Sequence, residues 1–522
     1  MFVGNSVLKN KAPRNTLFLL SLVALVVMPG MFLHISCSGQ KPGARPQAAA
    51  SELRYGFTTE PATLDPLSPS NTADGRSILF NVFEGLVKPD TEGRLIPCLA
   101  ESAALDPSAD QLGRVYQFKL RDNVRFHDGS PLAADDVQYS LTAARAAGFT
   151  GFDEIEKIEI TGEYDIRLIL RRPDPDFLPY LTVGIVKAGS TDRDKKAVGT
   201  GPYCIESYTV QQSLVLRKFA DYWKGSPPLE KITIVFFADS DALILGMYGG
   251  SIDGAGLPGA LARQLSPEQF DIVPGYSAMV QLLALNNAAP PLNDIRVRQA
   301  INYSIDIQAV IDAAFYGEGG PSGSPLIPGL AEYYEQSLAD PYPLNHEKAL
   351  SLLSEAGYGE GGRKLSLEIT VPASYTMHVD TAQVIADQLA KTGIDVSIRL
   401  VDWATWLSDV YRGRRYQATI ISLDSLYVSP KGFLSRYCSG DAANFINFNN
   451  ADFDRIYAMI LAETDAVKRI DLYRKAQQII SSNAASVYIQ DIMGFKAFRA
   501  GAFGGVLNYP LYVIDFAAMY GK

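Results

Sequence analysis

The 522-residue sequence has few of the residues that build metal centres or disulfide frameworks. It holds four cysteines, which lie too far apart to form a CxxC metal or redox motif. If Cys37 is modified, as argued below, three thiols remain, an odd number that leaves at least one of them free. Three histidines follow Cys37, too few for a dedicated metal cage. We therefore expect neither a metal site nor a cofactor.

Basic charge is also scarce, since the chain has 47 Lys and Arg residues and 57 Asp and Glu residues, for a net charge of −10. Nucleic-acid binding needs basic faces, so this balance argues against nucleic acid as a partner. The chain shows no nucleophile motif, and the Gly199-Thr200-Gly201 segment lacks the lysine of a phosphate loop. Asp135 and Asp136 are adjacent, so they favour stabilisation of a helix N-terminus over paired acid–base catalysis. We expect no enzymatic activity.

A long apolar run occurs at the N-terminus, and no later segment reaches the ~18 apolar residues of a spanning helix. Basic residues precede the run at 17–33, which is the layout of a secretory signal. The run ends near Cys37 in a sequence that resembles a bacterial lipobox. We therefore predict a signal peptide over 1–36, lipidation of Cys37 and a flexible Gly/Pro/Ala tether over 38–50. An uncleaved anchor, or ordinary cleavage near 48–50, is the alternative.

The remaining sequence has the hydrophobic patterns of a mixed α/β protein. The clearest unit is a strand at 365–371, a helix at 380–391 and a strand at 394–401, which together predict a right-handed βαβ unit. A helix is predicted at 77–86 near the N-terminus. A further strand is predicted at 416–423.

Residues 116–141, YQFKLRDNVRFHDGSPLAADDVQYSL, predict a strand, an Asp128-Gly129 turn and a helix with two acidic residues in its first turn. This block closely resembles the signature of the extracytoplasmic solute-binding proteins, family 5, that serve peptide and nickel ABC importers. Seven other segments resemble family segments in the same order: FNVFEGLV (80–87), VGTGPY (198–203), DYWKG (221–225), LNN (285–287), DIRVRQAINYSID (294–306), SPLIPG (324–329) and ALSLLSEAGY (349–358).

The resemblance implies an α/β, two-lobed periplasmic-binding-protein-like fold of type II, with an extra subdomain, mixed sheets and a hinge. A ligand would be enclosed between the lobes by hinge closure. The implied parts are lobe I (51–88 with 196–285 and 489–522), an inserted subdomain (89–195) and lobe II (286–488).

The resemblance also implies a function in the cell envelope. The protein would be the lipid-anchored substrate-binding component of an ABC importer, on a membrane facing the periplasm or the exterior. It would capture short peptides as a monomer and deliver them to the permease subunits. A receptor for another small ligand, such as a nickel chelate or a sugar, and a surface sensor or adhesin that has kept the fold are the alternatives.

One acidic residue matches the family position that pairs with the peptide's α-ammonium, at the end of a strand in the second lobe. That residue is Asp424. An enclosed ammonium needs a carboxylate within about 4 Å to offset its desolvation; the alternative is an Asp that forms a turn hydrogen bond. The Arg that clamps the carboxylate in dipeptide binders has no counterpart in residues 371–380, which leaves longer peptides or a different ligand open.

Further ligand contacts are implied at loops and aromatic residues, where extended peptides make main-chain hydrogen bonds. The candidates are Thr59, Glu60, Tyr276, Ser277, Trp403 and Trp406. For the two tryptophans, packing on the strand at 394–401 is the alternative.

Overall fold

The computed structural model describes residues 50–106, 113–425, 427 and 429–522, and only the backbone of Tyr276 and Ser277. The predicted signal peptide and Cys37 lie outside these residues. Within the described part of the chain, no helix is both long and apolar enough to cross a membrane.

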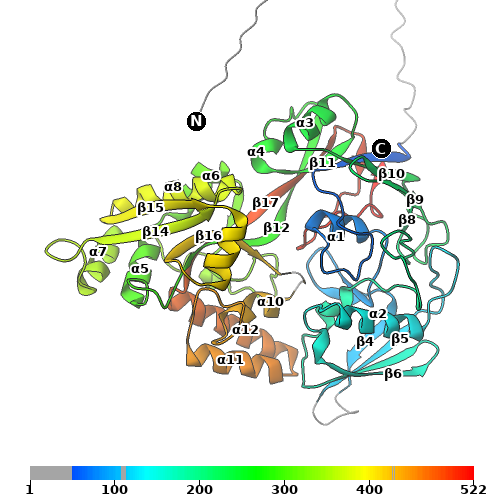
Figure 1. Ribbon diagram of the computed structural model, residues 1–522, viewed down its shortest axis with the longest axis horizontal. Helices are drawn as coiled ribbons and strands as arrows, with labels where there is room; N and C mark the ends of the chain where they lie inside the picture. The colour runs from blue at the N-terminus through cyan, green and yellow to red at the C-terminus, as the bar shows by residue number, and fades with distance from the viewer. Residues whose placement is uncertain (1–49, 107–112, 426, 428) are drawn as a thin grey trace, which may run out of the picture. The chain divides into compact units, whose positions relative to one another are not determined.

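Eleven of the described strands form one mixed sheet (Figure 1). They are β1 (Glu52–Phe57), β8 (Tyr203–Thr209), β9 (Ser213–Lys218), β10 (Lys231–Phe236), β11 (Gly254–Pro258), β12 (Phe270–Leu285), β13 (Gly319–Pro321), β14 (Leu365–Pro372), β15 (Ile394–Val401), β16 (Ala418–Asp424) and β17 (Ser486–Arg499). The order is β15-β14-β16-β12-β17-β11-β1-β10-β9-β8, and β13 also pairs with β17.

Strands β12 and β17 connect the two halves of this sheet, and Figure 1 shows them side by side between β16 and β11. Their antiparallel pairing is interrupted by a bulge between Tyr276 and Val280, where Val280 lies opposite Asp491. Ala278, inside the bulge, has a positive φ of 57°. On one side of the bulge β12 also pairs with β16, and on the other side β17 pairs with β11. The two strands therefore exchange neighbours at the bulge.

The predicted strand–helix–strand unit is confirmed. Strands β14 and β15 pair in parallel, and α8 (Thr376–Ala390) connects them. Ala382, Ile385 and Leu389 of the predicted apolar stripe are buried. The helix begins at Thr376 and not at 380, one turn earlier than predicted. The helices α5 (Ile295–Tyr303), α6 (Ile307–Phe315) and α7 (His346–Glu355) lie near this unit (Figure 1).

The block at 116–141 belongs to a smaller antiparallel sheet of four strands in the order β4-β5-β7-β6. Its strands are β4 (Ala100–Leu105), β5 (Val115–Leu120), β6 (Ile155–Gly162) and β7 (Asp165–Leu170). The helix that follows is α2 (Ala134–Ala146), with Asp135 and Asp136 in its first turn as predicted. Asp136 accepts the Ala133 N–H at 2.8 Å, so it completes the helix N-terminus.

The remaining elements complete the described part of the chain. They are α1 (Ala73–Leu79), β2 (Val87–Pro89), β3 (Leu95–Pro97), η1 (Phe152–Glu154), η2 (Leu178–Thr182), α3 (Ser240–Tyr248), α4 (Gly259–Ala262), η3 (Gln336–Leu338), α9 (Trp403–Thr405), η4 (Trp406–Arg412), α10 (Pro430–Leu434), η5 (Ser435–Tyr437), α11 (Ala451–Ala462), α12 (Ala466–Ser482), β18 (Phe503–Gly504) and β19 (Tyr520–Gly521). Helix α1 begins before the predicted 77–86, because Thr72 caps it by accepting the Gly75 N–H at 3.0 Å.

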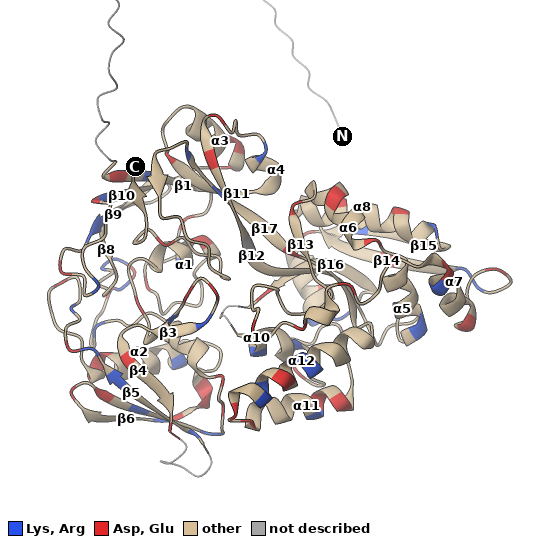
Figure 2. Cartoon of the chain, turned by 180° about the vertical axis from the view of Figure 1, so that it is seen from behind, with Lys and Arg blue, Asp and Glu red and all other residues tan. Residues whose placement is uncertain are grey.

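Buried apolar residues form several separate clusters among the described residues. The largest joins β1, β9 and β10 to the four-stranded sheet. A second packs α11 and α12 against β12 and β16, and a third packs α5 to α8 against β14. Figure 2 shows acidic and basic residues interspersed on α11 and α12. The predicted lobe boundaries stay a prediction.

Candidate ligand-binding site

A cavity of about 630 Å³ lies at the carboxyl ends of β14, β15 and β16. Strand β14 runs parallel to both β15 and β16, so the three carboxyl ends meet at one edge of the sheet. Ligands of open α/β sheets bind in the crevice outside such ends. The facing wall comes from β1, β12, β17 and residues 508–514 near the C-terminus. The topology therefore explains why the cavity forms here.

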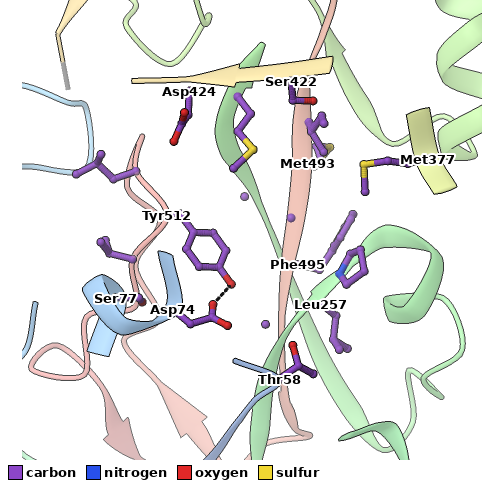
Figure 3. A pocket seen from close by; sticks show the side chains of 18 of the residues that line it. Thr58, Asp74, Ser77, Leu257, Met377, Ser422, Asp424, Met493, Phe495 and Tyr512 are labelled. Atoms are coloured by element: carbon purple, nitrogen blue, oxygen red, sulfur yellow. Dashed lines mark hydrogen bonds between the residues drawn. The ribbon is translucent and has the colours of Figure 1, made fainter. Parts of the chain in front are cut away.

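Asp424 is the last residue of β16 and faces the cavity (Figure 3). Its backbone oxygen accepts a hydrogen bond from Arg436 Nη2 at 2.7 Å, and its Cα pairs in register with Met279 of β12. Among the described residues, none donates a hydrogen bond to the Asp424 carboxylate. This carboxylate is therefore available to a cationic group of a ligand.

Two tryptophans form one wall of the cavity. The rings of Trp403 and Trp406 stack with centroids 5.0 Å apart and planes 5° apart. Trp406 is 3% exposed, and its Nε1 donates to Thr419 Oγ1 at 2.9 Å. Trp403 is 40% exposed, and Tyr375 packs edge-on against it at 5.5 Å. Trp406 is thus fixed in the core and supports Trp403, which is partly exposed and lines the cavity.

Asp74, of α1, also borders the cavity, but its carboxylate is already occupied. Tyr512 donates its hydroxyl to Asp74 Oδ1 at 2.7 Å, as the dashed line in Figure 3 marks. Burial raises the pKa of Asp74, while hydrogen bonds from Tyr512 and from Thr59 oppose that rise. The Asp74–Tyr512 pair therefore belongs to the wall and leaves Asp424 as the open acid.

The two basic side chains of the wall already have hydrogen-bond partners within the protein as well. Gln281 donates to His378 Nδ1 at 3.1 Å, which leaves the ring proton on Nε2, 3.5 Å from Ser422 Oγ. Burial lowers the pKa of His378 to about 4, so this histidine is neutral at pH 7. Lys496 Nζ donates to the Leu507 carbonyl oxygen at 2.7 Å, and burial lowers its pKa to about 8.

A second cavity of about 220 Å³ adjoins the first. The two share Met279, Asp424, Leu511, Tyr512 and Val513 in their walls. Asp424 therefore lies at the junction, where a charged end of a ligand would meet it while the remainder extended into either space.

The structure brings only some of the predicted site residues together. Asp424, Trp403 and Trp406 line the same cavity. Thr58 lines it in place of Thr59, which acts through Asp74. Glu60 accepts hydrogen bonds from the Tyr208 hydroxyl at 2.8 Å and from the Gln211 N–H at 2.9 Å. Its carboxylate therefore stabilises the conformation of its loop. The side chains of Tyr276 and Ser277 lie outside the described residues.

Sequence reasoning missed several residues of the wall, which come from segments far apart in the chain. They are Asp74, Tyr375, Met377, Tyr411, Met493 and Tyr512. Tyr375 and Met377 follow β14 directly, so the rule that ligands bind beyond the carboxyl ends of parallel strands would have found them. Tyr512 had no such signal, because its place depends on how the C-terminal segment returns to α1.

The cysteines and acidic groups give no sign of a metal centre. The described Cys98, Cys204 and Cys438 are all free thiols, in agreement with the prediction that at least one of the three is free. Burial raises the pKa of Cys204 to about 11 and that of Cys438 to about 12, so both stay protonated at neutral pH. No group of three or more His, Cys, Asp or Glu in the described residues is arranged to hold a metal.

The family model of the bacterial extracellular solute-binding proteins, family 5 (Middle), matches residues 94–445, well over half of the chain. The chain belongs to this family. The family predicted from the sequence is therefore confirmed, and the relatives of this family-5 protein are solute-binding proteins.

Known proteins with similar sequences include heme-binding protein A of Haemophilus influenzae, which is 26% identical over 93% of this chain and 95% of its own length. The oligopeptide-binding protein AppA of Bacillus subtilis is 23% identical over 90% of this chain and 92% of its own length. The solved ABC transporter substrate-binding protein CtaP of Listeria monocytogenes has a TM-score of 0.81 at 22% identity, covering 91% of this chain and 99% of CtaP. This family-5 protein thus has the predicted two-lobed α/β fold.

Proposed function

We propose that this protein is the substrate-binding component of an ABC importer and that it captures short peptides as a monomer. The observation that carries the proposal is the free carboxylate of Asp424 at the junction of two cavities. A peptide's α-ammonium would occupy this position, because a buried charge is stable only beside a partner. The rest of the peptide would extend into the spaces of about 630 and 220 Å³.

We also propose that the ligand is captured by hinge closure, which the two long strands support. The proposed lobe I comprises 51–88, 196–285 and 489–522, the inserted subdomain 89–195, and lobe II 286–488. Strands β12 and β17 connect these parts and exchange neighbours at the bulge opposite Asp491. A bulge weakens the ladder locally, so we place the hinge there. The closed form would be the one delivered to the permease subunits.

The membrane attachment is proposed from the N-terminal sequence. A lipid on Cys37 would hold the protein at the membrane on its extracytoplasmic face, and the segment to residue 50 would act as the tether. Metabolic labelling with radioactive palmitate should label the wild-type protein and leave Cys37→Ser unlabelled. Equal labelling of both proteins would contradict lipidation at this position.

The peptide-binding role is tested by calorimetric titration of ligand-stripped protein with short peptides. A peptide with a free N-terminus should bind at least about tenfold more tightly than its N-acetylated form, because acetylation removes the charge that faces Asp424. Asp424→Asn should lose a similar factor for the free peptide and little for the acetylated one.

A matched control is Asp452→Asn, which changes an exposed carboxylate paired with Arg455 on α11. This variant should bind as the wild type does. Unchanged affinity in Asp424→Asn would rule out the ammonium role of Asp424, and a peptide library without a single binder would rule out peptides.

A further inference from the structure

The polar groups of the larger cavity leave one carboxylate without a hydrogen-bond partner. Asp74 is held by Tyr512, Lys496 by the Leu507 carbonyl, and His378 is neutral. Among the described wall residues, Asp424 is the charged side chain without a partner. A ligand carboxylate held next to Asp424 would meet a like charge, which disfavours binding.

Much of the remaining wall is apolar, aromatic or sulfur-containing, with hydroxyl and amide groups such as Thr58, Ser77 and Asn508 among it. Figure 3 shows Met377, Met493, Phe495 and Leu257 around the cavity, with Asp424 at its edge. Methionine side chains are flexible and polarisable, so they adapt to apolar groups of different shape. The chain thus provides one acid beside a large apolar space.

Trp403 gives this space a definite geometry. Its 40% exposure is unusual for a tryptophan with such strong support from Trp406, Tyr375 and the Thr419 hydrogen bond of Trp406. A partly exposed aromatic ring in the wall of a cavity is the kind of surface on which a flat or large apolar group gains binding free energy without ordering the wall.

We propose that the site selects ligands in which an ammonium at Asp424 lies next to an aromatic or large aliphatic group against Trp403. For peptides, this means an apolar residue at the N-terminus and discrimination against an acidic one. The inference rests on the proposed function and makes it more specific. Trp403 then acts as a specificity-determining residue.

The test is calorimetric titration of ligand-stripped protein with four tripeptides, Phe-Ala-Ala, Leu-Ala-Ala, Gln-Ala-Ala and Glu-Ala-Ala. Burial of the phenyl group should make Phe-Ala-Ala bind roughly 30-fold more tightly than Gln-Ala-Ala. Glu-Ala-Ala should bind about tenfold more weakly than its isostere Gln-Ala-Ala, because its side-chain carboxylate lies next to the like charge of Asp424.

Two variants assign the preference to the tryptophan. Trp403→Ala should weaken Phe-Ala-Ala about tenfold and change Gln-Ala-Ala by less than about threefold, since only the apolar group contacts the ring. Val467→Ala, which truncates a side chain 70% exposed on α12, should leave both affinities unchanged.

The outcomes separate this inference from the function on which it rests. Four tripeptides of equal affinity would overturn the selectivity and leave peptide binding intact. Binding by none of the four would overturn the peptide function itself. The comparison of the wild-type affinities decides the question even if Trp403→Ala does not fold.

Discussion

The ionised groups of the cavity differ from those of a second, buried cluster of charges in whether they have a partner. The cluster, which we call the ion cluster, consists of Asp174, Asp176, Lys431 and Arg469. Lys431 pairs with Asp174, and Arg469 Nε lies 3.1 Å from Asp176 Oδ1. Tyr473 donates its hydroxyl to Asp176 Oδ2 at 2.5 Å. Every charge in the ion cluster has a partner, whereas Asp424 in the cavity has none among the described residues.

The ion cluster shows that buried charges are paired in this fold. Asp174 and Asp176 follow β7, and their partners lie on α10 and α12, so the ion cluster connects the four-stranded sheet to the helices of the second apolar cluster. Burial alone would lower the pKa of Lys431, yet the Asp174 carboxylate raises it above the ordinary value. The carboxylates that hold the structure together are buried and paired, whereas Asp424 is exposed and its carboxylate stays accessible to a ligand.

The largest predicted effect breaks the ion cluster. Lys431→Met leaves the Asp174 carboxylate buried without its cation, so the free energy of unfolding should fall by about 3–5 kcal/mol. Urea denaturation followed by circular dichroism measures this. Adding Asp174→Asn should recover much of the loss.

The matched control is Lys119→Met, which breaks a surface pair with Asp165, 3.2 Å away. Exposed pairs contribute less than about 1 kcal/mol, so this variant should stay near the wild type. Equal losses in Lys431→Met and Lys119→Met would contradict the role given to the ion cluster.

A smaller effect is expected at Asp491, which is buried like the ion cluster but is only partly paired. Its Oδ1 accepts the Met279 N–H at 3.2 Å, and its Oδ2 has no partner among the described groups. Burial raises the pKa of Asp491 to about 7. In the unfolded chain the pKa is about 3.9, so the unfolded state ionises first and stability falls as the pH rises from about 4 to about 7.

Asp491→Asn removes that loss, so it should raise the free energy of unfolding at pH 8 by roughly 2 kcal/mol, about half of the upper bound that the shift sets. At pH 4 the variant and the wild type should be equally stable. Thermal unfolding at both pH values measures the difference. The prediction is contradicted if the stability of the variant relative to the wild type is lower at pH 8 than at pH 4.

The periodic elements could be predicted from the sequence, because each depends on local side-chain patterns. The β14–α8–β15 unit and the position of Asp424 at a strand end are of this kind. The roles of individual loop residues could not be predicted. Glu60 has the chemistry of a ligand contact, yet Tyr208, 148 positions away, uses its carboxylate. The Lys431–Asp174 pair spans 257 positions and has no sequence signal at all.

The most direct test of the whole account is a crystal structure of the protein with Phe-Ala-Ala bound. We expect the peptide ammonium within about 4 Å of the Asp424 carboxylate, with the phenyl group against the exposed face of Trp403. A peptide whose ammonium lies away from Asp424, or whose phenyl group points out of the cavity of about 630 Å³, would contradict it.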